Sequence, residues 1–139
     1  MNNPRLQLKN VGQIRDANIE FGDLTVLVGP QATGKSIFLQ FLRLLVDTGY
    51  VIDELRKHGL VWNKDIGHFL DIYLGEGMRD VWRTGDNRSA IIYNGGPIDF
   101  LSLTQRRRRT KTESLFFIPA QRVLTLGRGW PRPFSDYEN

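Results

Sequence analysis

The chain has 139 residues, of which 40% are hydrophobic and 24% are charged, and its formal net charge is +4. This length allows one domain with a hydrophobic core of its own. The lack of cysteine excludes a disulfide scaffold and thiolate metal sites, and no apolar run reaches the roughly 18 to 20 residues of a membrane helix. Because the first residues also lack an apolar signal segment, we expect a cytoplasmic protein without a membrane partner.

Three short stretches at the start of the chain predict β-strands. Residues 6–11 and 17–21 alternate between apolar and polar side chains, which is typical of two half-buried strands in antiparallel arrangement. Residues 24–28 read Leu-Thr-Val-Leu-Val and have no polar face. This third run therefore predicts a strand that is buried on both sides.

Residues 29–36 read Gly-Pro-Gln-Ala-Thr-Gly-Lys-Ser, a complete G-x-x-x-x-G-K-[ST] phosphate-binding loop. Glycine at both ends of the loop lets backbone N–H groups close around an anion. Lys35 is placed to reach the β- and γ-phosphates, and the Ser36 hydroxyl is placed to bind Mg²⁺ at the start of the following helix. Because the loop lies between an apolar run and a helix-like stretch, the sequence predicts a site for ATP or GTP. The residues expected to contact the nucleotide are Gly29, Pro30, Gln31, Ala32, Thr33, Gly34, Lys35, Ser36 and Ile37, with Lys35 also a candidate catalytic residue.

The stretch after the loop predicts a helix over residues 36–47. Its polar residues fall on one stripe and nearly everything else is apolar, so we expect most of its circumference to be buried. Thr48 and Gly49 are expected to end the helix. The stripe consists of Ser36, Gln40, Arg43 and Asp47.

The remaining chain predicts further helices and strands. Residues 50–74 are expected to be mainly helical with interruptions at Gly59 and Gly67, and residues 89–104 to form a β-hairpin that turns at 94–97. Residues 114–118 predict a second buried strand. Taken together, these elements predict an α/β fold in which a mixed sheet surrounds the helix after the loop. We expect a domain over 1–124 and an irregular Gly- and Pro-containing tail over 125–139.

A basic run follows the predicted hairpin. It consists of Arg106, Arg107, Arg108 and Arg109, with Lys111 after them. One interpretation is a solvated loop between two strands. The other is a patch that contacts the phosphates of DNA, which would bind with strong salt dependence.

Several phrases of the sequence recur together in one group of ATPases. Residues 6–12 (Leu-Gln-Leu-Lys-Asn-Val-Gly), 19–22 (Ile-Glu-Phe-Gly) and 24–36 resemble the opening hairpin, strand and phosphate-binding loop of that group. The chain thus resembles the N-terminal lobe of an ABC-type P-loop ATPase of the structural-maintenance (SMC), RecF and OLD-like, AAA-type group. Gln31 replaces the asparagine that is usual in the group's loop, without removing a required group.

A second match lies further on. Residues 117–122, Phe-Ile-Pro-Ala-Gln-Arg, resemble the strand that leads into the Q-loop of OLD-like ATPases. The resemblance implies that Gln121 approaches Mg²⁺ and the γ-phosphate, as a candidate metal ligand and catalytic residue. The group also has an L-S-G-G signature and a Walker B strand that ends in Asp-Glu, and neither occurs here. Asp71 and Asp99 follow apolar residues, but both precede Gln121 and neither is followed by an acidic residue.

The missing motifs imply a partner. By the resemblance, a second ATPase chain or a C-terminal half would complete the site, and a homodimer around the nucleotide is one arrangement. Binding of Mg-ATP needs mainly the loop, Lys35 and Ser36, so we expect binding with very weak hydrolysis by this chain alone. Two alternatives stay open: a non-catalytic, nucleotide-dependent interaction module, and another P-loop GTPase or kinase. The last is weakened because residues 63–65 are one residue short of the guanine-reading N-K-x-D.

Overall fold

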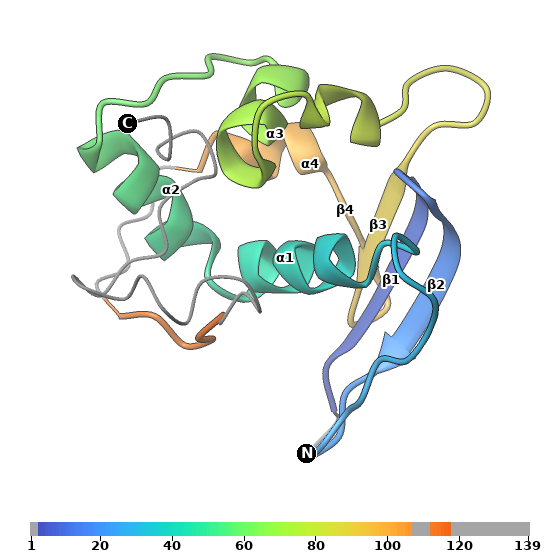
Figure 1. Cartoon of the computed structure of the whole chain (residues 1–139). Helices are drawn as coiled ribbons and strands as arrows, with labels where there is room; N and C mark the ends of the chain where they lie inside the picture. The colour runs from blue at the N-terminus through green and yellow to red at the C-terminus, as the bar shows by residue number, and fades with distance from the viewer. Residues whose placement is uncertain (1–2, 107–111, 118–139) are drawn as a thin grey trace.

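The computed structural model of the chain describes residues 3–106 and 112–117. Helices lie on one side of a β-sheet, which confirms the α/β class (Figure 1). The elements in chain order are β1 (Arg5–Val11), β2 (Ile14–Glu20), α1 (Lys35–Val46), α2 (Thr48–Lys57), α3 (Ile66–Leu74), the 3-10 helix η1 (Met78–Val81), β3 (Ala90–Tyr93), β4 (Gly96–Ile98) and α4 (Phe100–Thr104).

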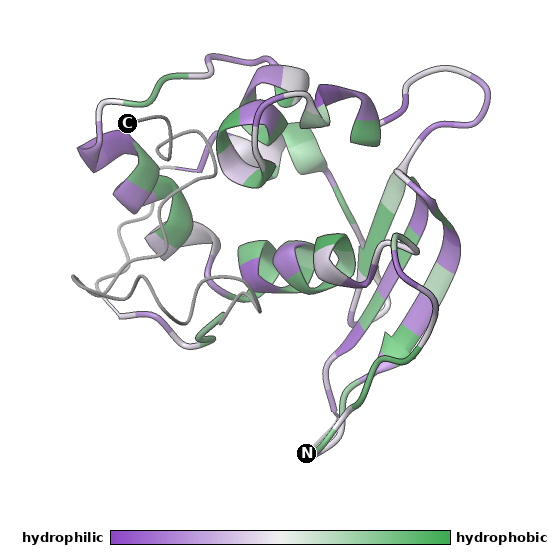
Figure 2. Cartoon of the chain, in the orientation of Figure 1, coloured by the Kyte–Doolittle hydropathy of each residue, from purple (hydrophilic) through white to green (hydrophobic). Residues whose placement is uncertain are grey.

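The sheet has the strand order β2-β1-β3-β4. The predicted N-terminal hairpin is confirmed, since β1 pairs with β2 in antiparallel register and places Leu8 opposite Ala17. The pairs β1–β3 and β3–β4 are antiparallel as well, so the prediction of a mixed sheet is wrong for the residues that the structure describes. Hydrophobic and hydrophilic residues alternate along β1 and β2 (Figure 2), because successive side chains point to opposite faces.

One hydrophobic core lies between the sheet and the helices. The inward residues of β1, Leu6 and Leu8, are fully buried there. An aromatic group joins the helices to one another: the ring of Phe100 lies 5.6 Å from that of Phe41 and 4.5 Å from that of Trp82, measured between centroids. Aromatic pairs in this range add stability beyond their buried area. Helix α1 is therefore fixed against both the sheet and the smaller helices.

The prediction of a buried strand over 24–28 is wrong. Residues 21–30 form no regular element, and Leu24, Val26 and Val28 are 85%, 69% and 86% exposed. A buried strand needs neighbouring strands and cover on both faces. In the described part of the chain no strand pairs with this run, and only Leu27 packs partly against the core.

The remaining helical predictions are correct in part. Helix α1 ends at Val46, one residue before the predicted end, although Thr48 and Gly49 already belong to the next helix, α2. Gly59 does follow the end of α2, with φ of 76°, whereas Gly67 lies inside α3. A Cβ at Gly67 would lie 3.2 Å from the Cβ of Arg79, so the glycine lets η1 pack closely on α3.

The predicted hairpin over 89–104 is correct only in its first half. Asn94 and Gly95 have φ of 50° and 81°, the conformation that an Asn-Gly turn adopts between two strands. From residue 100 the chain forms α4 instead of a strand. The Asp99 carboxylate accepts hydrogen bonds from the N–H and the hydroxyl of Ser102, at 3.3 and 2.6 Å, and so caps the helix.

The predicted strand at 114–118 is wrong for its described residues. Residues 114–117 form no strand, and Phe116 is 61% exposed. Residue 118, Gln121, the tail over 125–139 and Arg107, Arg108 and Arg109 lie outside the described residues. Within the described ranges, no helix combines the length and the apolar character needed to cross a membrane.

Candidate nucleotide-binding site

The phosphate-binding loop packs against the turn of the N-terminal hairpin. Residues 29–34 lead directly into α1, which begins at Lys35. A Cβ at Gly34 would lie only 2.8 Å from the Cγ1 atom of Ile14, and a Cβ at Gly12 would lie 3.6 Å from the Cδ1 atom of Ile37. Backbone and side chains of the hairpin therefore support the loop from one side. Ile37 itself is half-buried in this contact.

Within the described residues, no side chain binds the N-terminal end of α1. Gly34 is its N-cap in a left-handed conformation, with φ of 94°, and no side-chain hydrogen bond caps the helix there. The first turn also has no acidic residue. The first N–H groups of a helix have no partner within it and carry a positive partial charge. This end of α1 is therefore suited to an anion such as a phosphate group.

The Lys35 ammonium lies inside the loop. Its Nζ atom donates hydrogen bonds to the carbonyl oxygens of Gly29 and Pro30, at 2.8 and 2.5 Å, and lies 3.2 Å from the Thr33 Oγ1 atom. The Thr33 hydroxyl in turn donates to the Pro30 carbonyl at 2.9 Å. An ammonium group can exchange carbonyl oxygens for phosphate oxygens, because it is a compact point charge on a flexible stem. The loop thus holds its cation where a bound phosphate would meet it.

Ser36 and Gln31, the other polar side chains of the loop region, are exposed. The Ser36 hydroxyl stands in the first turn of α1, where it can bind Mg²⁺ that arrives with a nucleotide. Among the described residues no group of three His, Cys, Asp or Glu side chains could hold a metal ion by itself. A metal ion here would therefore take its remaining ligands from phosphates and water. Gln121, the second predicted ligand, lies outside the described residues.

Ala32 lies in a strained conformation that the sequence alone does not reveal. Its φ is 61°, in the left-handed region that costs a residue with a Cβ about 1 to 2 kcal/mol. We expect Ala32→Gly to raise the free energy of unfolding by about 1 kcal/mol and to leave the loop shape unchanged. Urea denaturation of both proteins measures the difference. An Ala32→Val variant provides the opposite control, since a β-branched residue should lower stability, and equal stability of all three proteins would contradict the assigned strain.

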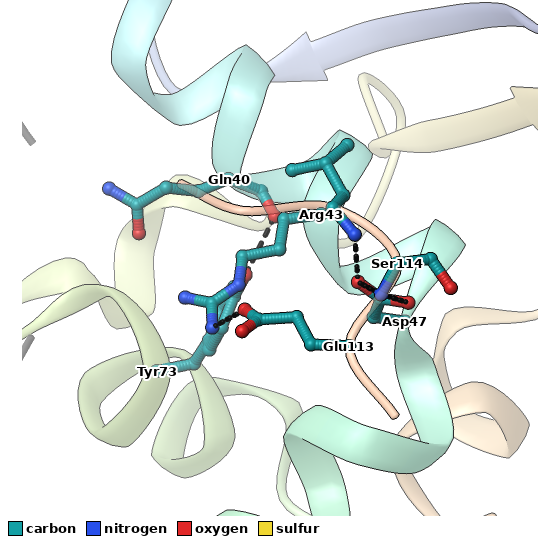
Figure 3. A network of polar contacts seen from close by, with 7 residues as sticks. Gln40, Arg43, Asp47, Tyr73, Glu113 and Ser114 are labelled. Atoms are coloured by element: carbon teal, nitrogen blue, oxygen red, sulfur yellow. Dashed lines mark hydrogen bonds and ion pairs between the residues drawn. The ribbon is translucent and has the colours of Figure 1, made fainter. Parts of the chain in front are cut away.

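The far end of α1 holds a buried polar network (Figure 3). The Asp47 carboxylate is 3% exposed and accepts hydrogen bonds of 2.7 to 2.9 Å from the backbone N–H groups of Ser114 and Leu115. One turn earlier, Arg43 forms an ion pair of 2.7 Å with Glu113. Two of the four residues in the predicted polar stripe of α1, Arg43 and Asp47, thus contact residues 113–115. Sequence reasoning missed this role, because a polar stripe is usually solvated.

Tyr73 adds a further contact between α3 and α1. Its hydroxyl donates a hydrogen bond of 2.8 Å to the backbone carbonyl of Gln40. Burial raises the pKa of this phenol far above its usual value, with a smaller upward contribution from Asp47. The hydroxyl therefore stays a donor through the neutral pH range. Helix α1 is held at its N-terminal end by the hairpin and along its second half by α3 and residues 113–115.

The sequence around this loop matches a known family of protein domains. Residues 5–123 match the AAA domain. The chain belongs to the AAA domain family. The match begins with β1 and includes the whole loop, and it identifies the chain as a nucleotide-binding, ATPase-like module. Comparisons with curated proteins and with solved structures found no match.

Proposed function

We propose that this AAA domain binds Mg-ATP through residues 29–36, as the N-terminal part of an ATPase of the SMC, RecF and OLD-like group. The observation that carries the proposal is the N-terminal end of α1. In the part of the chain that the structure describes, this end has no side-chain cap, its first turn has no acidic residue, and the Lys35 ammonium lies beside it within the loop. A helix end without a cap costs stability unless a ligand or water satisfies its N–H groups. A nucleotide phosphate provides those acceptors.

Each residue of the loop has a distinct part in this proposal. The backbone N–H groups of residues 31–36 would surround the β-phosphate, with Gly29 and Gly34 giving the room that a side chain would fill. Lys35 would turn from its carbonyl partners to the β- and γ-phosphates, and the Ser36 hydroxyl would bind Mg²⁺. When bound, Mg²⁺ neutralises charge on the phosphates and lowers the cost of transferring the γ-phosphoryl group.

Hydrolysis by this chain alone is expected to be very weak. The sequence has no Walker B motif, and the two carboxylates that come nearest to one have other roles. Asp71 binds the guanidinium of Arg79 at 2.7 Å, and Asp99 caps α4. Neither is placed in a strand beside the loop. Phosphate release at a rate typical of complete ATPases, lost on Lys35→Ala, would contradict this part of the proposal.

A second ATPase chain or a C-terminal half would supply the missing carboxylates. The run over 24–28 supports this, because it forms no regular element and leaves the apolar side chains of Leu24, Val26 and Val28 uncovered directly before the loop. An apolar run of this kind can form a strand when another strand pairs with it. A partner strand that ends in Asp-Glu, paired with residues 24–28, would bring its acidic residues close to the loop. The same arrangement applies to a homodimer in which each copy contributes to the other's nucleotide site.

Lys35→Ala is expected to weaken ATP binding by about 30- to 150-fold, because a charged hydrogen-bond donor to phosphate contributes roughly 2 to 3 kcal/mol. Titration calorimetry with Mg-ATP measures the change. Lys64→Ala is the matched control, since it removes the same charge from an exposed position outside the loop. Equal affinity of the Lys35→Ala and wild-type proteins would overturn the proposal. GTP that competes as strongly as ATP would instead favour a different class of P-loop protein.

A further inference from the structure

A second site lies away from the phosphate-binding loop. A cavity of ≈ 310 Å³ opens between the last turn of α2 and the end of α4, and its lining includes Arg56, Val61, Trp62, Asn63 and Gln105. Figure 1 shows these helix ends on the side of the molecule opposite the hairpin that supports the loop. The cavity is at the small end of the range of about 300 to 1,000 Å³ that holds a small molecule. It therefore fits one flat ring rather than a double helix.

The Arg56 guanidinium is fixed at the rim of this cavity. Its Nη1 atom donates a hydrogen bond of 3.0 Å to the carbonyl of Arg106, and its Cζ atom lies 5.4 Å from the centroid of the Trp62 ring. The Trp62 ring is itself held, because its Nε1–H donates to the Thr104 carbonyl at 3.0 Å. A preorganised guanidinium loses less side-chain entropy when it binds an anion. Arg56 is thus suited to hold a phosphate group.

The charge around the cavity is positive. None of its lining residues is acidic. The nearest carboxylates on α2, those of Asp53 and Glu54, form ion pairs with Lys57 at 3.5 and 2.7 Å. Arg106 is exposed beside the cavity, and the sequence continues with further arginines outside the described residues. An anion that approaches this face therefore meets Arg56 and Arg106, while the exposed Asp65 carboxylate, two residues after Asn63, accepts the His68 N–H at the start of α3.

The cavity also offers an apolar wall and polar groups suited to a nucleobase. Val61 lines the cavity and is 65% exposed, so a flat apolar surface can pack against its side chain. The side-chain amide of Gln105 donates to the backbone carbonyl of Asn63, and this contact fixes one wall. The amides present donors and acceptors of the kind that read the edge of an unpaired base. An acidic peptide would use the arginines but not the apolar wall.

We propose that this cavity binds single-stranded nucleic acid, with a phosphate at Arg56 and Arg106 and a base against Val61. The arginine fork matches the geometry of phosphate oxygens. A base in the cavity must be unstacked and unpaired, which selects a single strand over a duplex. This site is separate from the ATP site, and its occupation does not require nucleotide in the loop.

Fluorescence anisotropy with a labelled single strand of DNA tests the proposal in the absence of ATP. The strand should have about 20 nucleotides, because small single-strand binders cover ~4 to 16 nucleotides. Arg56→Gln and Arg106→Gln are each expected to weaken binding by about 5- to 10-fold and to reduce the slope of log K against log salt by about 0.7. Arg88→Gln is the matched control, because it removes the same charge from an exposed position in the loop before β3. Figure 1 shows that this loop lies on the sheet side of the molecule, away from α2. The affinity of Arg88→Gln should stay within about twofold of the wild type.

Two further measurements separate the proposal from its competitors. Val61→Asp should abolish binding, because it places a negative charge at the rim. Val61→Ser should weaken binding less, because it removes only the apolar contact with the base. Val61 is exposed, so the fold should persist in both variants. A duplex of the same sequence and polyglutamate should displace the labelled strand poorly. Equal weakening by Arg88→Gln, or displacement by either competitor as strong as by the unlabelled strand, would overturn the proposal.

Discussion

Gly34→Ala is expected to remove nucleotide binding and to lower the free energy of unfolding by about 2 to 4 kcal/mol. Two independent costs add up at this position. The backbone φ of 94° is one that residues with a Cβ adopt only under strain, and the new Cβ would lie 2.8 Å from the Cγ1 atom of Ile14. Ile14 is buried in the core and cannot move without disturbing the hairpin. Urea denaturation and titration with Mg-ATP measure the two effects.

A second variant separates the two costs of the Gly34 substitution. Ile14→Ala removes the Cγ1 atom that the new Cβ would meet. In combination with Gly34→Ala it should therefore relieve this clash but leave the backbone strain at residue 34. The double variant is therefore expected to lose less than the sum of the two single variants. Gly22→Ala is the control, because nothing lies within 4 Å of a Cβ there and its φ is not positive. If Gly34→Ala were as harmless as Gly22→Ala, the loop would not have the assigned shape.

The local features of the site could be predicted from the sequence. The alternation of apolar and polar residues predicts the β1–β2 hairpin, and the apolar stretch after Lys35 predicts α1. Both patterns indicate an element that buries apolar side chains against its neighbours. The loop directly before α1 could also be predicted, because its glycine and lysine positions follow a known motif, whereas its contacts with a nucleotide stay a prediction. Ala32 could not be placed in the left-handed region in advance, since alanine carries no signal for it.

The features that depend on distant parts of the chain could not be predicted. Val26 is predicted to be a buried strand residue, yet it is exposed because no strand among the described residues covers it. The apolar composition of a segment shows only that it is able to form a buried strand. Its contacts with the rest of the fold determine whether it is buried. Phe100 likewise lies in a helix because Asp99 caps it, although its neighbours are typical of a strand. The hydrogen bonds of Asp47 join it to Ser114 and Leu115, which are far away in the sequence, so no local sequence pattern predicts them.

Asp47→Ala is expected to lower the free energy of unfolding by about 3 kcal/mol, since it removes a buried carboxylate that accepts hydrogen bonds from two backbone groups. The N–H groups of Ser114 and Leu115 would lose their acceptor, at 2.9 and 2.7 Å, in a place that water does not reach easily. The segment 112–117 should therefore leave α1, although the rest of the core does not depend on it. Hydrogen exchange of the Ser114 and Leu115 amides should accelerate by about 10- to 100-fold, more than that of the amides in β1.

Matched variants show which part of the network holds the segment. Asp47→Asn keeps one acceptor oxygen but loses the charge, so its effect should lie between those of the wild type and Asp47→Ala. Glu113→Gln removes only the ion pair with Arg43 and should leave the amide of Leu115 protected. Asp23→Ala changes an exposed carboxylate and should have no effect beyond about 0.5 kcal/mol. If the Ser114 and Leu115 amides exchange equally fast in wild type and Asp47→Ala, the carboxylate does not anchor the segment, and α1 is held in place by the hairpin and α3 alone.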